Sequence, residues 1–258
     1  MPRANQESPS KLLLTVAFCI LSWTISTQDA SAAKIFSDDF NDGNAQDGMP
    51  VTWVPSLGTW DASSGDYVAT GPTPRVALVP DHVLGDTSVR TQVRVTGTIG
   101  AAIGLRRQPL FGYAGELRAN GTMAIARLDG AALPVFLGGA DVPFSPVDQD
   151  VMLQFDAFGD KLSLWAWPVG ESMPDEPQVV AFDATYPEGP AGLISAAFVA
   201  SPTDSTTYRF VHVANTHIPE PTTLVLMGLG GLVLLCARRV RAQRTTVSRA
   251  VTANRTNS

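Results

Sequence analysis

The sequence predicts an all-β domain for residues 34–217, built as an antiparallel sandwich of two sheets. Apolar and polar residues alternate through this region, and no stretch keeps a helical period beyond two turns. Turn-forming pairs containing glycine separate the alternating stretches. About a dozen short strands at this spacing indicate two packed sheets. No repeat of fixed period is present, which argues against a propeller or a solenoid.

The strand positions follow from this alternation. In residues 87–96, Val89 and Val93 point to one side while Arg90 and Arg94 point to the other. Such a strand has one buried and one solvated face. Further strands are expected at residues 34–40, 59–62, 67–70, 75–80, 101–106, 113–119, 122–128, 131–137, 151–157, 161–167, 178–184, 192–199 and 206–214.

Glycine pairs fix the turns between several of these strands. Asn120-Gly121 and Asp129-Gly130 supply the positive φ angles that two-residue hairpin turns need. A meander is therefore expected across residues 113–137, and Ser64-Gly65 joins a further hairpin.

The first 33 residues have the three parts of a secretory signal peptide. Arg3 and Lys11 precede an apolar stretch at residues 12–25, and the small residues Ala30-Ser31-Ala32-Ala33 follow it. We expect an N-terminal signal helix in residues 1–33 that is removed after Ala32 or Ala33.

A second apolar stretch, residues 222–237, lies near the end of the chain. As a helix it would be about 24 Å long, short for a hydrocarbon core of about 30 Å, and arginines that reach the headgroups can close the gap. Six arginines and no acid occupy residues 238–255, so the positive-inside rule keeps this end in the cytoplasm. We expect one short transmembrane helix at 222–237, membrane-stop arginines Arg238, Arg239, Arg241 and Arg244, and a polar cytoplasmic tail at 245–258.

Pro219-Glu220-Pro221 stands directly before this apolar stretch. The motif, the membrane segment and the arginine cluster, in this order over residues 218–244, resemble the PEP-CTERM sorting signal of exported bacterial proteins. The resemblance implies recognition by an exosortase-type processing peptidase, with Pro219, Glu220 and Pro221 as the sorting motif. It also implies an intermediate anchored in the inner membrane, followed by release to the cell envelope, the cell surface or the extracellular matrix.

The charge and the cysteine content of residues 34–218 limit the kinds of partner and of chemistry expected for this region. Residues 34–218 hold 10 basic and 21 acidic side chains. An acidic exported domain argues against nucleic acid or an anionic lipid surface as a partner, because both require basic patches. Cys19 and Cys236 fall outside this region, which excludes a disulfide or thiol chemistry within it.

Several short motifs across residues 34–215 resemble the laminin-G-like, concanavalin A-like jelly rolls of secreted bacterial proteins. They are Ser-Asp-Asp-Phe-Asn-Asp-Gly at 37–43, Gly-Thr-Trp-Asp at 58–61, Gly-Asp-Tyr-Val at 65–68, Leu-Ser-Leu-Trp-Ala-Trp at 162–167 and Gly-Pro-Ala-Gly-Leu at 189–193. The resemblance implies a sandwich that often binds carbohydrate and sometimes holds a structural calcium ion. A jelly roll by itself does not fix function.

Catalytic signatures are absent from the sequence. It contains no Gly-x-Ser-x-Gly elbow, no His-Glu-x-x-His motif and no phosphate-binding loop. The strand with paired carboxylates that related glycosidases use is also missing. We therefore expect no enzyme. The alternative is a divergent glycoside hydrolase or lyase that uses Glu116 or Asp156 with an acid from another strand.

Oxygen-bearing side chains crowd the end of the first expected strand, at residues 38–42. Hard cations prefer such ligands, and a structural calcium ion held by Asp39 and Asp42 is one interpretation. The other is an Asx turn at the strand end. No other cofactor is expected.

Aromatic side chains with amides and acids nearby are the candidates for binding sugar. Trp165 and Trp167 are two residues apart in one expected strand and so share a face. Trp60 and Tyr113 lie in or beside loops. For each of the three tryptophans, filling the core or the space between the sheets is the default role. Three arginines could meet an acidic polysaccharide, although a solvated strand face is their default role: Arg106, Arg107 and Arg118.

These features together predict an exported, membrane-sorted surface or matrix protein. Its sandwich would bind a glycan, such as an exopolysaccharide, or another envelope component without catalysis. The alternatives are the hydrolase or lyase described above and a purely structural or adhesive surface protein.

Overall fold

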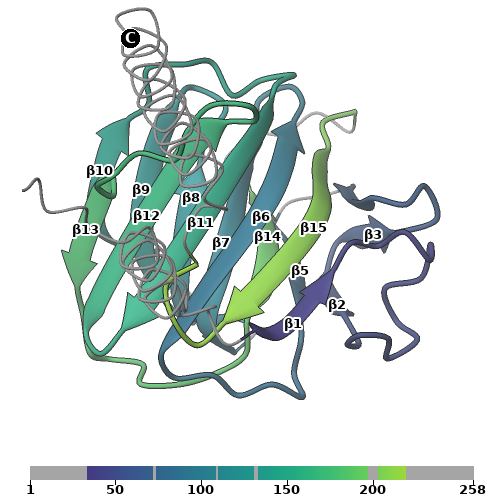
Figure 1. The fold of residues 1–258 in the computed structure, drawn as a ribbon, viewed down its shortest axis with the longest axis horizontal. Coiled ribbons are helices and arrows are strands. Elements are labelled where there is room, and N and C mark those ends of the chain that lie inside the picture. Colours follow the sequence, from purple (N-terminus) through teal and green to yellow (C-terminus); the bar gives the residue numbers. More distant parts are fainter. Residues whose placement is uncertain (1–33, 72–73, 109, 131–132, 197–202, 219–258) are drawn as a thin grey trace, which may run out of the picture. The chain divides into compact units, whose positions relative to one another are not determined.

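A computed structural model describes residues 34–71, 74–108, 110–130, 133–196 and 203–218. These residues form strands and no helix, arranged as two stacked antiparallel sheets (Figure 1). The predicted two-sheet sandwich is confirmed. No described segment is a helix that could cross a membrane. The expected signal peptide, and the sorting motif with everything that follows it, lie outside the described residues.

The first sheet has eight strands. Its order is β13 (Val179–Phe182), β12 (Lys161–Pro168), β11 (Asp150–Phe158), β6 (Thr87–Val95), β15 (Thr206–Ala214), β4 (Tyr67–Thr70) and β3 (Thr59–Asp61). The eighth strand, β1 (Lys34–Asp38), pairs with β15 beyond the point where β4 ends.

The second sheet has seven strands. Its order is β10 (Val135–Asp141), β9 (Thr122–Asp129), β8 (Phe111–Leu117), β7 (Gly100–Gln108), β14 (Gly192–Ala196), β5 (Arg75–Leu78) and β2 (Val54–Leu57). In Figure 1 this sheet lies behind the strands β12, β11, β6 and β15.

The main core lies between the two sheets. Along β11, Leu153 and Phe155 point inward and are fully buried. Gly115 of β8 approaches so closely from the opposite sheet that a Cβ there would lie 2.8 Å from Phe155 and from Leu164 of β12. The alternation in the sequence therefore marks the core-facing and outer faces of each sheet.

The predicted hairpins and the positive φ angles of their glycines are confirmed, but the connections are longer than two residues. Gly121, Gly130 and Gly65 have φ angles of 84°, 82° and 81°, the left-handed conformation that glycine adopts without a steric cost. The three glycines lie in the connections from β8 to β9, from β9 to β10 and from β3 to β4, and each of these strand pairs is antiparallel. In the first connection the backbone N of Gly121 donates to the carbonyl oxygen of Arg118, so residues 119 and 120 are the central residues of the turn.

Two elements differ from the sequence prediction, and proline accounts for both. The strand β2 contains Pro55 and was not predicted; it lies at the edge of its sheet, where a residue without an N–H is tolerated. The strand expected at 131–137 begins only at Val135, directly after Pro134.

Candidate ligand-binding sites

A polar hollow of about 160 Å³ opens between the β1–β2 loop and the β3–β4 hairpin. One wall is Trp60 of β3, an aromatic residue predicted to bind ligand. The other lining residues are Gly43, Asn44, Ala45, Gln46, Asp61, Ala62 and Tyr67. Pockets that enclose drug-sized ligands measure about 300–1,000 Å³, so this hollow has room for one small ring rather than an extended chain.

Contacts on the core side hold the Trp60 ring in place. Its indole Nε1 donates to the carbonyl oxygen of Leu57 at 3.0 Å. The ring centroid lies 4.8 Å from that of Tyr67 and 6.0 Å from that of Tyr208. The ring is half-buried, so it packs against the core and also forms part of the hollow.

The polar groups of the hollow are a carboxylate and two amides. Asp61 accepts hydrogen bonds from the backbone N and the Oγ of Ser63 at 3.0 and 2.8 Å, and these bonds lower the pKa of Asp61. Within the described residues, neither Nδ2 of Asn44 nor the side-chain amide of Gln46 makes a hydrogen bond. An aromatic wall with donors and acceptors beside it is suited to the hydroxyl groups of a sugar.

Trp165 and Trp167 lie on the outer face of the eight-stranded sheet. The intervening Ala166 belongs to the core, and so does Leu164. The two indole side chains are only 6% and 4% exposed. The ring of His217 lies 5.2 Å from that of Trp165, and the guanidinium carbon of Arg90 lies 5.3 Å from the centre of the Trp167 ring. Both tryptophans are thus already in contact with groups of this chain.

Polar side chains from neighbouring strands surround these tryptophans. Asp156 of β11 accepts hydrogen bonds from Ser88 Oγ at 2.6 Å and from Gln154 Nε2 at 3.0 Å, and its Oδ2 lies 2.6 Å from His217 Nδ1. Gln154 Oε1 accepts from Arg90 Nε at 2.7 Å. We call Arg90, Gln154, Asp156, Trp165 and Trp167 the tryptophan face.

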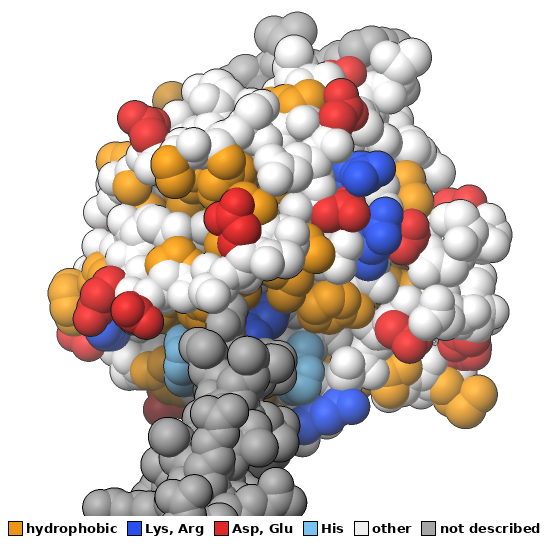
Figure 2. Space-filling view, turned by 45° about the horizontal axis from the view of Figure 1, so that its top comes forward, with side chains coloured by type: hydrophobic (Ala, Val, Ile, Leu, Met, Phe, Trp, Pro, Cys, Tyr) orange, Lys and Arg blue, Asp and Glu red, His pale blue; other side chains and the backbone are white. Residues whose placement is uncertain are grey.

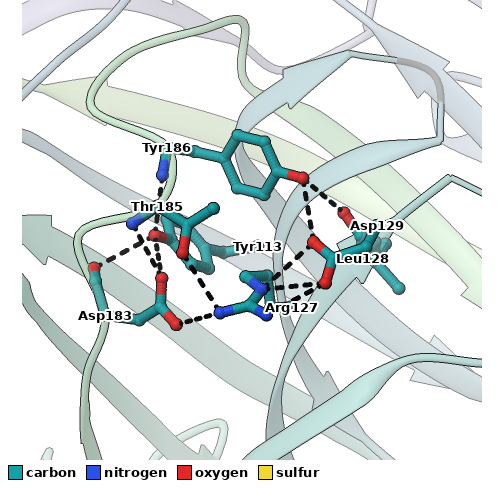
Figure 3. A network of polar contacts seen from close by, with 7 residues as sticks. All are labelled: Tyr113, Arg127, Leu128, Asp129, Asp183, Thr185 and Tyr186. Carbon is teal, nitrogen blue, oxygen red and sulfur yellow. Dashed lines mark hydrogen bonds and ion pairs between the residues drawn. The ribbon is translucent and has the colours of Figure 1, made fainter.

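Tyr113 occupies a different part of the molecule. Its ring is fully buried in the core between the sheets, and it therefore offers no exposed platform to a sugar. Its hydroxyl donates to Asp183 Oδ1 at 2.7 Å and accepts from the backbone N of Tyr186 at 3.0 Å (Figure 3). Asp183 in turn lies 2.6 Å from Nη1 of Arg127. This network connects β8 and β9 to the segment after β13.

Arg106 and Arg107 do not lie on a solvated strand face, so that expectation is wrong for both. Their exposed fractions are 3% and 1%. A bulge between Leu105 and Gln108 interrupts the alternation of β7, and Arg106 adopts a φ of 51° there. Arg118 does remain at the surface and pairs with Glu116 at 2.8 Å.

Glu116 and Asp156, the acids considered for catalysis, point to opposite outer surfaces. Their strand neighbours, Leu117 and Phe155, both belong to the core between the sheets. Because side chains alternate along a strand, Glu116 points outward from the seven-stranded sheet and Asp156 from the eight-stranded sheet. These two carboxylates therefore share no site.

The geometry of Asp39 and Asp42 favours the Asx-turn interpretation. Each carboxylate accepts a hydrogen bond from the backbone N two residues further on, at 3.3 Å from Asn41 and 2.9 Å from Asn44. Within the described residues, no three His, Cys, Asp or Glu side chains are grouped so as to hold a metal ion. Both carboxylates are thus engaged with the backbone, and a calcium ion at Asp39 and Asp42 stays a prediction.

On the Asx-turn interpretation, calcium is expected to leave the thermal stability unchanged. A ligand that binds only the folded state raises the unfolding temperature, so the unfolding midpoints with millimolar calcium and with a chelator should coincide. Differential scanning calorimetry checks this. A higher midpoint with calcium, lost in the variant Asp42→Ala, would contradict it.

Several basic side chains lie next to acidic ones on the face that Figure 2 shows. Arg94 and Arg209 both contact Asp150, at 2.8 and 3.5 Å. The described residues of this face therefore form no continuous basic surface to which a polyanionic glycan could bind.

The sequence singled out Trp165 and Trp167 as ligand-binding residues and Asp156 as a possible catalytic acid, but it did not predict that they lie together. The alternation of residues 87–96 already placed Arg90 on an outer face, and the same period in the strand expected at 151–157 puts Gln154 and Asp156 on one face. The missing information was which strands are neighbours, and only the sheet order supplies it.

The end of the chain matches the model of the PEP-CTERM protein-sorting motif over residues 217–241. The predicted sorting signal is thus confirmed, and it implies a protein that is exported, anchored in the membrane and then sorted to the surface. His217 and Ile218 are the two residues of the match that the structure describes. No curated protein matches the chain.

Several solved structures resemble the sandwich. The carbohydrate-binding module CBM66 from Bacillus subtilis is 16% identical, with a TM-score of 0.52 over 64% of this chain and 96% of that one. The VIP36 exoplasmic/lumenal domain in its Ca²⁺-bound form is 16% identical, with a TM-score of 0.53 over 72% and 92%. SCLam, a non-specific endo-β-1,3(4)-glucanase from family GH16, is 10% identical, with a TM-score of 0.51 over 71% and 91%. The likeness establishes the fold, a concanavalin A-like jelly roll.

Proposed function

We propose that this chain is an exported, membrane-sorted surface protein whose sandwich binds a glycan without catalysis, and that the hollow beside Trp60 takes one sugar unit. The observation that carries the proposal is the meeting of Trp60, Asn44, Gln46 and Asp61 around a hollow of about 160 Å³. Sites for small ligands typically combine an apolar wall with a few polar groups that fix orientation.

The fold and the sorting signal support this proposal. A carbohydrate-binding module has the same fold, and the VIP36 domain has been solved with Man3GlcNAc bound. The matched sorting motif implies delivery to the surface, where envelope glycans and exopolysaccharides are the available ligands. Glu116 and Asp156 point to opposite surfaces, so a hydrolase would have to pair one of them with an acid from another strand.

A glycan array should detect binding by residues 34–218, with weaker binding in the variant Gln46→Ala. The Gln46 side chain is exposed and makes no hydrogen bond within the described residues, so its removal should leave the fold intact. Loss of one hydrogen bond should lower the affinity about fivefold. The variant Gln108→Ala, which removes an exposed amide outside the hollow, is the control and should bind normally.

The same samples distinguish the alternative functions. Incubation with β-glucans and acidic exopolysaccharides should release no new reducing ends, and their appearance would favour the hydrolase. Absence of both binding and cleavage would favour a structural or adhesive protein. Undiminished binding by the variant Gln46→Ala would remove the hollow as the site.

A further inference from the structure

The first two residues of the segment that matches the sorting-motif model are in contact with the sandwich. His217 and Ile218 open the matched segment, and Pro219 follows immediately. The side chain of Ile218 is 6% exposed, whereas Thr216 two residues earlier is exposed. We call residues 216–218 the junction. The described chain is therefore in contact with the sandwich as far as Ile218, the residue before Pro219.

Three residues of the tryptophan face hold His217. Its Nδ1 lies 2.6 Å from Asp156 Oδ2 and 3.1 Å from Gln154 Nε2. Its ring also packs against that of Trp165, with 5.2 Å between the centroids. Asp156 is 3% exposed, and a carboxylate buried to this degree requires partners of this kind.

A fourth residue of this face, Arg90, holds Ile218 through its backbone. Nη2 of Arg90 donates to the carbonyl oxygen of Ile218 at 2.6 Å, while Nε of the same guanidinium binds Gln154. A hydrogen bond from a charged donor is about twice as strong as a neutral one. This bond fixes the backbone of the residue directly before the Pro-Glu-Pro motif.

We propose that the tryptophan face is an intramolecular docking site for the junction, and that the junction must leave this face before the sorting motif is processed. A peptidase needs an accessible segment of backbone, and here the last carbonyl before the motif and the ring before it are both engaged. When opening is fast, cleavage follows the population of the open form. The strength of docking therefore sets the rate of processing.

Thiol labelling tests the docking directly. In the full chain with Cys19→Ala and Cys236→Ala, the substitution Ile218→Cys places a single thiol in the docked position, and Thr216→Cys places it in an exposed one. A maleimide reagent should label position 218 at least tenfold more slowly than position 216. Adding Arg90→Met should raise the rate at position 218 about 10- to 100-fold, as expected for loss of one charge-assisted hydrogen bond.

Matched variants make the test decisive. Arg94 lies on the same outer face of β6 but pairs with Asp150, so the substitution Arg94→Met should leave the labelling rate unchanged. His217→Ala removes a half-exposed ring without disturbing the core, and it tests the docking even if Arg90→Met fails to fold. Equal labelling at positions 216 and 218, or no acceleration by His217→Ala, overturns the proposal.

A second measurement follows loss of the tail from the full chain in cells that contain the processing peptidase. Arg90→Met and His217→Ala should each speed this loss severalfold relative to Arg94→Met. This cell-based experiment rests on the proposed sorting function, whereas the labelling experiment does not. Slow labelling at position 218 combined with unchanged processing would refute the link to processing and leave the docking site standing.

Discussion

Replacing Arg106 by methionine is expected to lower the free energy of unfolding by about 3–5 kcal/mol. The Arg106 side chain is 2% exposed. Its Nε donates to the carbonyl oxygen of Gly85 at 3.1 Å, and its Nη1 donates to those of Gly159 and Tyr186 at 2.8 and 3.1 Å. Methionine fills a similar volume but leaves three carbonyl groups without this donor.

The cost is large because these three carbonyls belong to separate segments. Gly85 lies in the loop before β6, Gly159 in the β11–β12 turn, and Tyr186 in the segment after β13. Asp86 reinforces the arrangement, since its carboxylate accepts from the backbone N of Gly159 at 2.8 Å. One guanidinium thus binds three loops at once, in addition to the backbone hydrogen bonds that join the segment after β13 to each of the other two.

Urea titration of the variant Arg106→Met measures the loss, and calorimetry should show an unfolding temperature lower by roughly 10 °C. The matched control is Arg118→Met. The Arg118 side chain is 39% exposed and pairs only with Glu116 among the described residues, and exposed pairs of this kind contribute about 0–1 kcal/mol. Similar losses in the two variants would contradict this role of Arg106.

Arg106 also shows why its place could not be predicted. The alternation along residues 101–106 predicts that Arg106 points away from the core into solvent. The bulge after Leu105 interrupts this alternation, and the Arg106 side chain is buried instead. The bulge depends on two distant glycines, because a Cβ at Gly112 would overlap the Arg106 carbonyl and one at Gly189 would lie 2.6 Å from its carbonyl carbon. A single sequence does not reveal that these three residues meet.

Local patterns, in contrast, predicted most of the strands and turns. The period of two in residues 87–96 and the Asn120-Gly121 pair are properties of a few neighbouring residues, and the structure has β6 and the β8–β9 hairpin there. The exception was β2, where Pro55 hid an edge strand. The alternation of apolar and polar residues along a strand, and the residue types of a turn, depend only on neighbouring positions. A single sequence is therefore enough to recognise them.

The candidate sites could be predicted only in part, for the same reason. The spacing of Trp165 and Trp167 placed both on one face, but their polar neighbours come from other strands. Gln154 is the register partner of Arg90 on one side and of Trp165 on the other. That order of strands β6, β11 and β12 follows from the packing of the whole sandwich, and no local pattern specifies it.

Asp183→Asn is expected to lower the free energy of unfolding at neutral pH by about 2–3 kcal/mol. The Asp183 carboxylate lies 2.6 Å from Nη1 of Arg127 and accepts from the hydroxyl of Tyr113 at 2.7 Å (Figure 3). Asparagine keeps the shape and one acceptor but removes the charge facing Arg127. The control Asp141→Asn, which alters an exposed acid at the end of β10, should cost well under 1 kcal/mol.

The difference between wild type and Asp183→Asn should itself depend on pH. Burial raises the pKa of Asp183, but hydrogen bonds from Thr185, Tyr113 and Arg127 outweigh it and lower this pKa to about 2. The ionised carboxylate therefore stabilises the fold above the unfolded-state pKa of about 3.9. This stabilisation is lost as the pH falls through the folded-state pKa.

Urea titrations of both proteins at pH 6, 4, 3 and 2 measure that loss. The Asp183 side chain is only 10% exposed, so the lowered pKa corresponds to about 2 kcal/mol. The stability difference should shrink by about this amount between pH 5 and pH 2, because the wild type loses a stabilising charge that the variant never had. A difference that stays constant over this range would mean that the charge of Asp183 does not stabilise the fold, and that Tyr113 and Arg127 are held by shape and neutral hydrogen bonds alone.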